Sequence, residues 1–354
     1  MIDRRTLLKG AGLMAAGGAV TTAATAPASA AVRREPAAHT HGSWGGGAFQ
    51  DPKGARARVL DLNDASGDPD GLFATVHALL STSTVVTGLV TTLNSDDPSS
   101  TPATDGVPIA REMLRLMGLS RSVPVYAGSN VKLTNRTTPQ TSDGARALIA
   151  EATRTDTTLP LYVTVGGNLT DVASAYLMRP DIASKFTLVW IGGAPYPAGG
   201  REYNLSQDPT AAQVVFNDSP IPIWQVPSNA YAQNAVGVTE LQLHVKPHGR
   251  IGAWLYAQLL NRLNNPPQGF PNLGEQYVLG DSPLVLLTAL TNAYDPTGSG
   301  GVGSAQYDTM YAPLINPDGT YQARSSGRQI RVYKSVDSRL IFGDFFAKLR
   351  LNYG

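Results

Sequence analysis

The chain has 354 residues, of which 42% are hydrophobic, which is enough for a substantial core in one large domain or two modest ones. Its 28 basic and 27 acidic residues leave a net charge of +1, so overall charge gives no attraction to nucleic acid or anionic lipid. The sequence contains no cysteine, which excludes disulfides, thiolate zinc sites and a lipid anchor on a cysteine. The informative features are therefore local.

Residues 1–30 are typical of a twin-arginine export signal. Arg4 and Arg5 precede a weakly apolar stretch rich in alanine and glycine, and Ala28-Ser29-Ala30 supplies a small-residue cleavage site. A membrane anchor is the alternative, but the stretch is a poor anchor, and no later segment reaches roughly 18 uninterrupted apolar residues. We expect export by the twin-arginine machinery to the periplasm or the exterior, with no stable membrane insertion after cleavage.

Residues 31–55 are rich in glycine and polar groups and have no hydrophobic period, which indicates a flexible arm or linker. The arm contains His39 and His41. A pair of histidines suggests a metal, but in such an arm we expect both to be solvated.

From residue 56 onward, short apolar runs alternate with helical patterns. This alternation predicts βαβ units, and hence an open, mostly parallel sheet flanked by helices with a Rossmann-like core. No repeat and no change of composition marks a second domain, so we expect one domain over residues 56–354, with helical additions near residues 248–300. The predicted strands include 85–92, 123–128, 159–167, 186–193 and 221–227.

The stretch "VLDLNDASGDPDGLFATVHALL" places four aspartates at one strand-to-helix turn, with no lysine or arginine among them. In parallel sheets, ligands bind beyond the carboxyl ends of the strands. Carboxylate oxygens favour Ca²⁺ or Mg²⁺. An EF-hand is excluded because, counting from Asp64, Pro69 and Thr75 stand where that motif needs glycine and glutamate. A solvated turn and a metal site both remain open.

Two later stretches bear on that choice. In "EYNLSQDPTAAQVVFN", Asp208 and Pro209 form a strong helix start, which predicts Asp208 as the N-cap. In "LGDSPLVLLTAL", Asp281 stands at the start of an apolar helix, with Pro283 just inside it. Asp281 has two readings, as a helix cap or as a metal ligand.

Taken in order, five stretches resemble the inosine–uridine-preferring nucleoside hydrolase family. They are "LNDASGDPDGL", "GGNLTDVASA", "WIGGA", "EYNLSQDPTAAQVVF" and "GDSPLVLL". The likeness covers about residues 57–350. The resemblance implies an exported, divergent member with the family's α/β fold. It also implies hydrolysis of the N-glycosidic bond of a ribonucleoside or related riboside by a water that Ca²⁺ positions.

The resemblance also implies roles for individual residues. Asp64 matches the aspartate that binds Ca²⁺ and acts as base toward the attacking water, and Asp70 and Asp281 match the other acidic calcium ligands. The backbone carbonyl near Val165 matches the remaining protein ligand, with one residue of ambiguity. Metal ligands are thus expected at Asp64, Asp70, Val165 and Asp281.

Substrate-binding positions follow in the same way. Asp68 matches the residue that binds a ribose hydroxyl, and Glu202 and Asn204 match residues that hold the sugar hydroxyls. Asp281 is expected to bind the substrate as well. Carboxylates near the ring suit this chemistry because the sugar passes through an oxocarbenium-like state. A cation would also explain how a folded chain tolerates the acidic turn.

One departure concerns the leaving group. Well-known members have a histidine directly before the late aspartate, whereas Gly280 stands here. His77 is expected to lie on the surface or to pack. His244 and His248 stand near a polar stretch that could contribute by a loop. The aromatic candidates for this end of the site are Trp224, Tyr196, Tyr203 and Tyr277.

Two other functions remain open. A noncatalytic exported nucleoside- or sugar-binding protein would keep the pocket without the leaving-group chemistry, and a hydrolase of another glycoside would need two acids flanking the bond. The expected partner in each case is a small molecule. Assembly into a homo-oligomer is also left open, because the family is often oligomeric.

Overall fold

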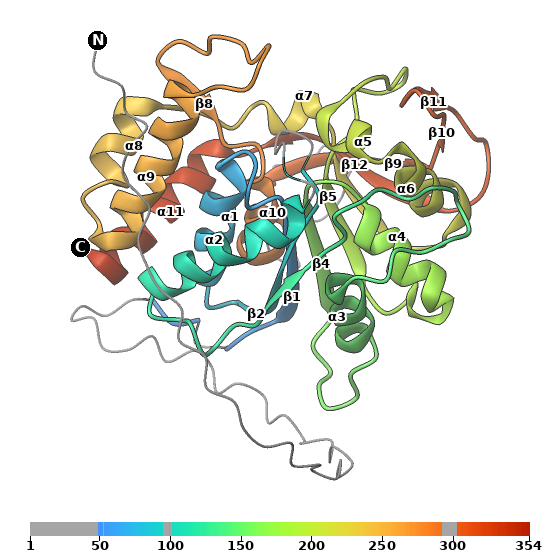
Figure 1. Cartoon of the computed structure of the whole chain (residues 1–354), viewed down its shortest axis with the longest axis horizontal. Helices are drawn as coiled ribbons and strands as arrows, with labels where there is room; N and C mark the ends of the chain where they lie inside the picture. Colours follow the sequence, from blue (N-terminus) through green and yellow to red (C-terminus); the bar gives the residue numbers. More distant parts are fainter. Residues whose placement is uncertain (1–48, 52, 95–98, 100, 292–302) are drawn as a thin grey trace, which may run out of the picture. The chain divides into compact units, whose positions relative to one another are not determined.

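The computed structural model describes residues 49–51, 53–94, 99, 101–291 and 303–354. An eight-stranded sheet runs through this part of the chain in the order β3-β2-β1-β4-β5-β6-β12-β9 (Figure 1). Neighbouring strands are parallel, except that the edge strand β9 is antiparallel to β12. The predicted open, mostly parallel α/β fold is confirmed. The strands are β1 (Ala57–Asn63), β2 (Thr84–Thr91), β3 (Val125–Ala127), β4 (Leu161–Gly166), β5 (Thr187–Ile191), β6 (Ile223–Val226), β9 (Ala305–Tyr311) and β12 (Gln329–Val336).

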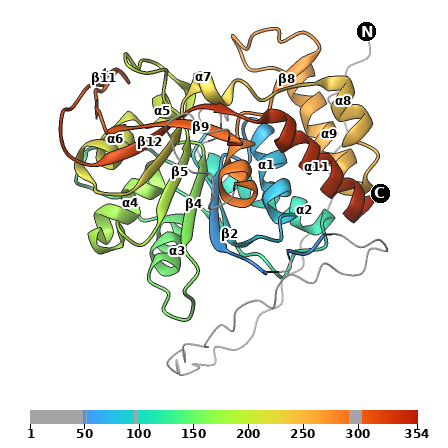
Figure 2. The same ribbon diagram turned by 180° about the vertical axis from the view of Figure 1, so that it is seen from behind.

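Helices cover both faces of the sheet, so its inner strands are buried on each side. On β1, Val59 belongs to one apolar core, and Leu60 and Leu62 belong to the other, because successive side chains of a strand point to opposite faces. Figures 1 and 2 show the two sets of helices on either side of the sheet. The first core takes in α1 (Asp70–Leu79), α2 (Pro102–Leu116), α8 (Val238–His244), α9 (Gly249–Asn264), α10 (Pro283–Val285) and α11 (Ser338–Tyr353). The second takes in α3 (Asp143–Ala152), α4 (Thr170–Met178) and α6 (Pro209–Gln213).

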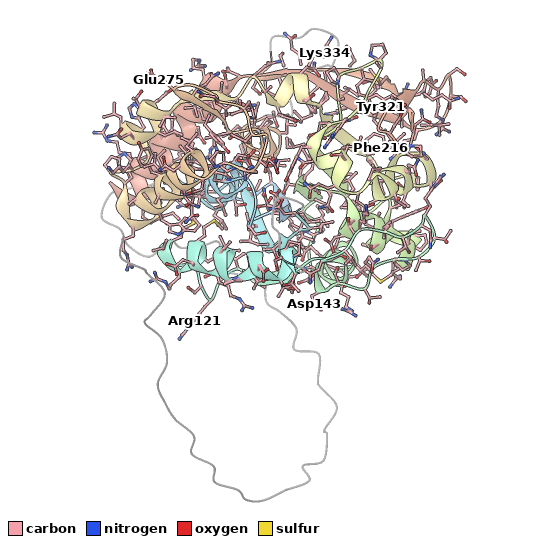
Figure 3. All side chains as sticks on the ribbon, turned by 45° about the horizontal axis from the view of Figure 1, so that its top comes forward. Arg121, Asp143, Phe216, Glu275, Tyr321 and Lys334 are labelled. Atoms are coloured by element: carbon pink, nitrogen blue, oxygen red, sulfur yellow. The ribbon has the colours of Figure 1, made fainter. Side chains whose placement is uncertain are left out.

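Aromatic packing closes the second core. Trp190 on β5 is fully buried and meets Phe216, labelled in Figure 3, edge to face at a centroid distance of 5.6 Å. The Trp190 indole N–H donates to the carbonyl of Gly167 over 2.9 Å, which fixes the glycine turn after β4. This turn lies at the end of the sheet where the sequence predicts the site.

The remaining elements are short. Two pairs of small antiparallel strands stand apart from the main sheet, β7 with β8 and β10 with β11. Their bounds are β7 (Ala235–Gly237), β8 (Gln276–Val278), β10 (Leu314–Ile315) and β11 (Tyr321–Gln322). The other helical segments are η1 (Pro180–Ile182), α5 (Tyr203–Gln207), η2 (Val214–Asp218), α7 (Ser228–Tyr231) and η3 (Leu286–Leu290).

The five predicted strands are confirmed as β2 to β6, and the helical additions near residues 248–300 are confirmed as α9 and α10. The strands after residue 300 are not among the predicted ones. β9 and β12 alternate buried and exposed residues near the sheet edge, so they lack the continuous apolar runs of the inner strands. Figure 2 shows these two strands and α11 closing the sheet.

The export signal predicted at 1–30 and the two histidines of the arm lie outside the described residues. Among the described residues, no helix combines the length and apolar character that a membrane span requires.

Candidate active site

A cavity of about 660 Å³ opens at the carboxyl ends of β1, β4 and β5. We call it the aspartate cavity. Six side chains that the sequence predicts as site residues line it: Asp64, Asp68, Asp70, Glu202, Asn204 and Asp281. Val165 is a buried residue of β4, and it is its neighbour Gly166 that lines the cavity. In Figure 1, α5, α7 and β8 stand around this end of the sheet.

The acidic turn folds as a tight connection between β1 and α1. The Gly67 N–H donates to the Asp64 carbonyl over 2.7 Å, and the Asp70 N–H donates to Asp68 Oδ1 over 3.2 Å. Helix α1 then begins at Asp70, directly after Pro69. Asp64 is only 3% exposed, so this part of the turn is not a solvated surface loop.

Asp61 differs from the other aspartates of the stretch. Its carboxylate accepts hydrogen bonds from the hydroxyls of Thr75 at 2.6 Å and Thr164 at 2.7 Å. Burial raises its pKa although both hydroxyls act to lower it. It is not among the residues that line the aspartate cavity, and its hydrogen bonds tie α1 to β1 and β4.

Asp281 brings the far end of the chain to the acidic turn. Asn63 Nδ2 donates to Asp281 Oδ2 over 3.0 Å, and the Asp281 N–H donates to Asp70 Oδ2 over 3.2 Å. Ser282, not Asp281, is the N-cap residue of α10, and its side chain makes no cap hydrogen bond. The reading of Asp281 as a helix cap is therefore wrong, because its side chain faces Asn63 instead.

Burial, together with crowded negative charge, raises the pKa values of the carboxylates in the cavity. Burial raises the pKa of Asp281 to about 7, assisted by the charges of Asp68, Asp61 and Glu202 and opposed by the hydrogen bond from Asn63. Burial also raises the pKa of Asp70 well above its ordinary value, and the charges of Asp281, Asp68 and Asp64 raise it further. The cavity thus stabilises added positive charge.

The donors present fit a hard cation, although no described group of three or more acidic or histidine side chains converges as a finished metal centre. Asp70 and Asp281 are adjacent, and Asn63 Oδ1 is buried without a hydrogen-bond partner. A Cβ atom on Gly166 would stand 2.1 Å from Asp281 Oδ2, so the β4 backbone lies against that carboxylate. Carboxylate oxygens, a side-chain amide oxygen and backbone carbonyl oxygens are the ligand types that Ca²⁺ prefers.

Glu202 organises the wall of the cavity. Its carboxylate caps α5 and accepts hydrogen bonds from the N–H groups of Gly193 at 2.7 Å, Leu205 at 3.0 Å and Asn204 at 3.2 Å. The Tyr231 hydroxyl donates to the same carboxylate over 2.9 Å. Asn204 is fixed separately, because its Nδ2 donates to the carbonyl of Ile191 on β5 over 2.9 Å.

The rim of the aspartate cavity formed by residues 262–277 includes Arg262 and Phe270, which the sequence does not predict as site residues. The Arg262 guanidinium stands 3.6 Å from Asp68 Oδ2 and lies over the Phe270 ring at 4.9 Å from its centroid. Phe270 and Tyr277 are near-parallel at 22° with a centroid distance of 6.4 Å. The glycine- and proline-rich stretch 266–274 is the only sequence signal for this rim, and such stretches usually mark plain loops.

Of the side chains considered as proton donors to the leaving group, only some line the aspartate cavity. Tyr203 and Tyr277 line the aspartate cavity, and the Tyr277 hydroxyl donates to Asp68 Oδ1 over 2.8 Å. Trp224 and Tyr196 do not line it. His77 is 2% exposed and contacts Asp344 at 2.7 Å, which confirms packing as its role. His244 and His248 are not among the lining residues either.

The family model for inosine-uridine preferring nucleoside hydrolases matches residues 63–293, which is more than half of the chain. The chain belongs to this family. Its place there makes it a hydrolase that acts on N-glycosyl compounds. A comparison with curated protein sequences finds no match.

Solved structures agree with the fold. A plant nucleoside hydrolase has a TM-score of 0.61 at 18% identity, over 83% of this chain and 99% of its own. The purine-preferring ribonucleoside hydrolase of Gardnerella vaginalis has a TM-score of 0.61 at 17% identity with the same coverage. The inosine-uridine preferring nucleoside hydrolase of Bacillus anthracis gives 0.59 at 19%, again over 83% and 99%.

Proposed function

We propose that this nucleoside hydrolase cleaves the N-glycosidic bond of a ribonucleoside or related riboside with a water that Ca²⁺ positions. The observation that carries the proposal is the gathering of the six predicted acidic and amide side chains in one cavity at the carboxyl ends of the strands. That is the place where parallel sheets bind ligands.

The proposed calcium ligands are Asp64, Asp70, Asp281 and a backbone carbonyl at Val165 or Gly166. Support comes from the raised pKa values of Asp70 and Asp281, since crowded carboxylates are relieved by a dication. Bound Ca²⁺ would orient the attacking water and lower its pKa.

The chain's own residues supply the rest. Asp64 is proposed as the base that takes the proton of the attacking water. Asp68 is proposed to accept a hydrogen bond from a sugar hydroxyl, because Tyr277 and Arg262 hold its carboxylate at the cavity wall. Glu202 and Asn204 are proposed to bind the sugar from α5. The clustered carboxylates would stabilise the positive charge that develops on the ring.

Tyr231 and Tyr277 bring hydroxyl groups to the aspartate cavity, where they donate to Glu202 and Asp68. Burial raises the pKa of both hydroxyls, and neighbouring carboxylates raise it further. Both hydroxyls therefore remain protonated at neutral pH and can donate hydrogen bonds. Gly280 leaves no imidazole beside Asp281, so protonation of the leaving group by one of these tyrosines would require its hydroxyl to turn from the carboxylate to the substrate.

We also propose export by the twin-arginine route, with removal of residues 1–30. The support is the sequence pattern around Arg4, Arg5 and Ala28 to Ala30. Fusion of residues 1–30 to a folded reporter, compared with the same fusion carrying Arg4→Lys and Arg5→Lys, tests this route. Loss of export in the substituted fusion is the expected result.

The central test is release of free sugar and base from purine, pyrimidine and nicotinamide ribosides, with Ca²⁺ and with chelator. The variants are Asp64→Ala and a control, Asp143→Asn, which changes an exposed aspartate at the start of α3 (Figure 3). We expect one substrate class to be cleaved, chelator and Asp64→Ala to abolish cleavage, and Asp143→Asn to leave it unchanged. Calcium binding without cleavage of any riboside would instead favour the noncatalytic binding protein or a hydrolase of another glycoside.

A further inference from the structure

A second cavity, of about 430 Å³, lies at the opposite ends of the strands from the aspartate cavity. Ala57, Tyr162 and Trp224 line it, and they are the first or second residues of β1, β4 and β6. The two cavities share no lining residue. The mechanism proposed above therefore makes no use of this space.

The walls of this cavity are largely aromatic, and one arginine of the lining contacts two of the rings. Arg331 on β12 has its guanidinium carbon 4.5 Å from the centroid of Trp224 and 4.6 Å from that of Tyr307. Tyr162 approaches Trp224 at a centroid distance of 5.2 Å, and Tyr333 approaches Tyr307 at 5.2 Å. Both distances are within the range of cation–π contacts, which restrain the guanidinium without using its N–H groups as hydrogen-bond donors.

A second arginine completes a cationic wall. Arg56, directly before β1, lines the same cavity and donates from Nη2 to the carbonyl of Thr288 over 3.3 Å. The charges of Arg331 and Arg56 both act to lower the pKa of the Tyr162 hydroxyl, against the larger raising effect of its burial. Both guanidinium groups are therefore within electrostatic reach of one point in the cavity.

Among the described residues of the lining, no carboxylate offers a counter-charge to these two guanidinium groups. The described lining residues include no aspartate or glutamate, and no ion pair of Arg56 or Arg331 is found among the described residues. The nearby acid on β9, Asp308, instead pairs with Lys334 at 2.8 Å. Two guanidinium groups in an aromatic cavity without a counter-charge are suited to an anionic ligand.

The threonines of the wall do not compete for that role. The Thr288 hydroxyl donates to the carbonyl of Leu284 over 2.7 Å, and the Thr291 hydroxyl donates to that of Leu287 over 2.9 Å. Their protons are used within the segment that contains η3. The positively charged donors of the described lining are then the two arginines.

We propose that this arginine–aromatic cavity binds a small organic anion with a flat aromatic body, either an aromatic carboxylate or an aromatic phosphate monoester. The guanidinium edges of Arg331 and Arg56 bind the anionic group, and the aromatic rings contact the flat body. An inorganic anion would leave most of the 430 Å³ unfilled. A neutral aromatic compound would provide no negative charge to pair with the two guanidinium groups.

Isothermal titration of the full-length protein with four probes tests the proposal. The probes are phenyl phosphate, benzoate, the neutral analogue benzamide, and inorganic phosphate. We expect saturable binding of one molecule per chain for phenyl phosphate or benzoate, and the tighter of the two identifies the anionic group. Benzamide and inorganic phosphate should bind at least roughly ten-fold more weakly.

Three variants locate the binding. Arg331→Gln and Arg56→Gln should each weaken the preferred anion roughly ten-fold or more, and Arg339→Gln, an arginine whose side chain is 85% exposed, should have no effect. Because Arg56 is exposed, we expect Arg56→Gln to fold normally, and this variant still tests the proposal if Arg331→Gln proves unstable. Asp64→Ala should bind as the wild type does, because the two cavities are separate.

The proposal is overturned by any of three results. These are no saturable binding of either aromatic anion, equal affinity for benzamide, or unchanged affinity in the Arg56→Gln variant. Each of these outcomes is independent of whether the aspartate cavity hydrolyses a riboside.

Discussion

The side-chain amide of Asn63 donates a hydrogen bond to Oδ2 of Asp281 over 3.0 Å, although the two residues are 218 positions apart. Asn63 ends β1, and Asp281 precedes α10, so this bond joins the acidic turn to the C-terminal part of the site. Both side chains are buried. A buried carboxylate needs such donors, since burial without them is costly.

Replacement Asn63→Ala is expected to lower the free energy of unfolding by about 1.5–3 kcal/mol at pH 8, because a hydrogen bond to an ionised group is lost. At that pH Asp281 is mostly ionised, since its pKa is about 7. Urea unfolding measures the change, with the exposed Asn229→Ala as control. In an Asp281→Asn background the loss should shrink, and an undiminished loss there would show that the bond itself is not responsible.

Gly166 tests how closely β4 approaches Asp281. A Cβ atom at this position would lie 2.1 Å from Asp281 Oδ2 and 2.7 Å from Asn63 Nδ2. We therefore expect Gly166→Ala to displace the carboxylate, to cost roughly 1–3 kcal/mol of stability and to lower the hydrolysis rate at least ~10-fold.

The matched control for Gly166 is Gly343→Ala in α11, where an added Cβ would meet nothing within 4 Å. That variant should gain up to about 1 kcal/mol of stability, because alanine favours a helix over glycine, with unchanged hydrolysis. If Gly166→Ala behaves like this control, the carboxylate does not depend on the close approach of the strand.

The sequence was sufficient to predict the inner strands and to bring together the aspartates that line the aspartate cavity, because each leaves a local signal. β4 and β5 are continuous apolar runs, and Asp64, Asp68 and Asp70 follow a strand directly. Asp208 was likewise identified as the cap of α6, where its side chain accepts from the Ala211 N–H over 2.9 Å.

The rest of the site depends on tertiary contacts that no local pattern records. In the sequence, Arg262 is one of the polar residues of an amphipathic helix and carries no special signal. Only the packing of α9 places its guanidinium beside Asp68. Asn63 is likewise only a polar residue at the end of a strand in the sequence, and its hydrogen bond to Asp281 is visible only in the structure. Tyr231 likewise gains its role only through Glu202. Sequence spacing cannot reveal partners that are far apart along the chain.

His77 predicts a pH dependence of stability outside the site. Burial lowers its pKa from 6.5 to about 4, while Asp344 acts to raise it and Lys348 acts to lower it. The imidazole is thus neutral in the folded protein, whereas the unfolded chain takes up a proton below pH 6.5. The neutral imidazole therefore contributes to the free energy of unfolding above pH 6.5. This contribution falls by up to about 3 kcal/mol as the pH decreases toward 4.

The aspartates with raised pKa, such as Asp281, act in the opposite direction in the same range, so the difference between two proteins is the useful measurement. Urea unfolding of the wild type and of His77→Gln at pH 7.5 and 5 should show a smaller decline with acid in the variant. Equal declines would mean that His77 is protonated in the folded state.

Calcium should stabilise the folded protein, because the aspartate cavity holds crowded carboxylates that the unfolded chain does not. A ligand at a concentration of 100 times its Kd adds about 2.7 kcal/mol when it binds the folded state alone. We expect the melting temperature to rise with Ca²⁺ but not with sodium at equal ionic strength. Differential scanning calorimetry with a chelator baseline makes this measurement.

Asp70→Asn separates metal binding from a general salt effect. The negative charges of Asp281, Asp68 and Asp64 all oppose ionisation of Asp70, so removing its charge should make the metal-free protein more stable than the wild type. The same variant should lose most of the response to Ca²⁺, while the exposed Asp143→Asn keeps it. A variant that is stabilised in chelator and still responds fully to Ca²⁺ would place the cation away from Asp70. A wild type that does not respond at all would remove calcium from the proposed mechanism.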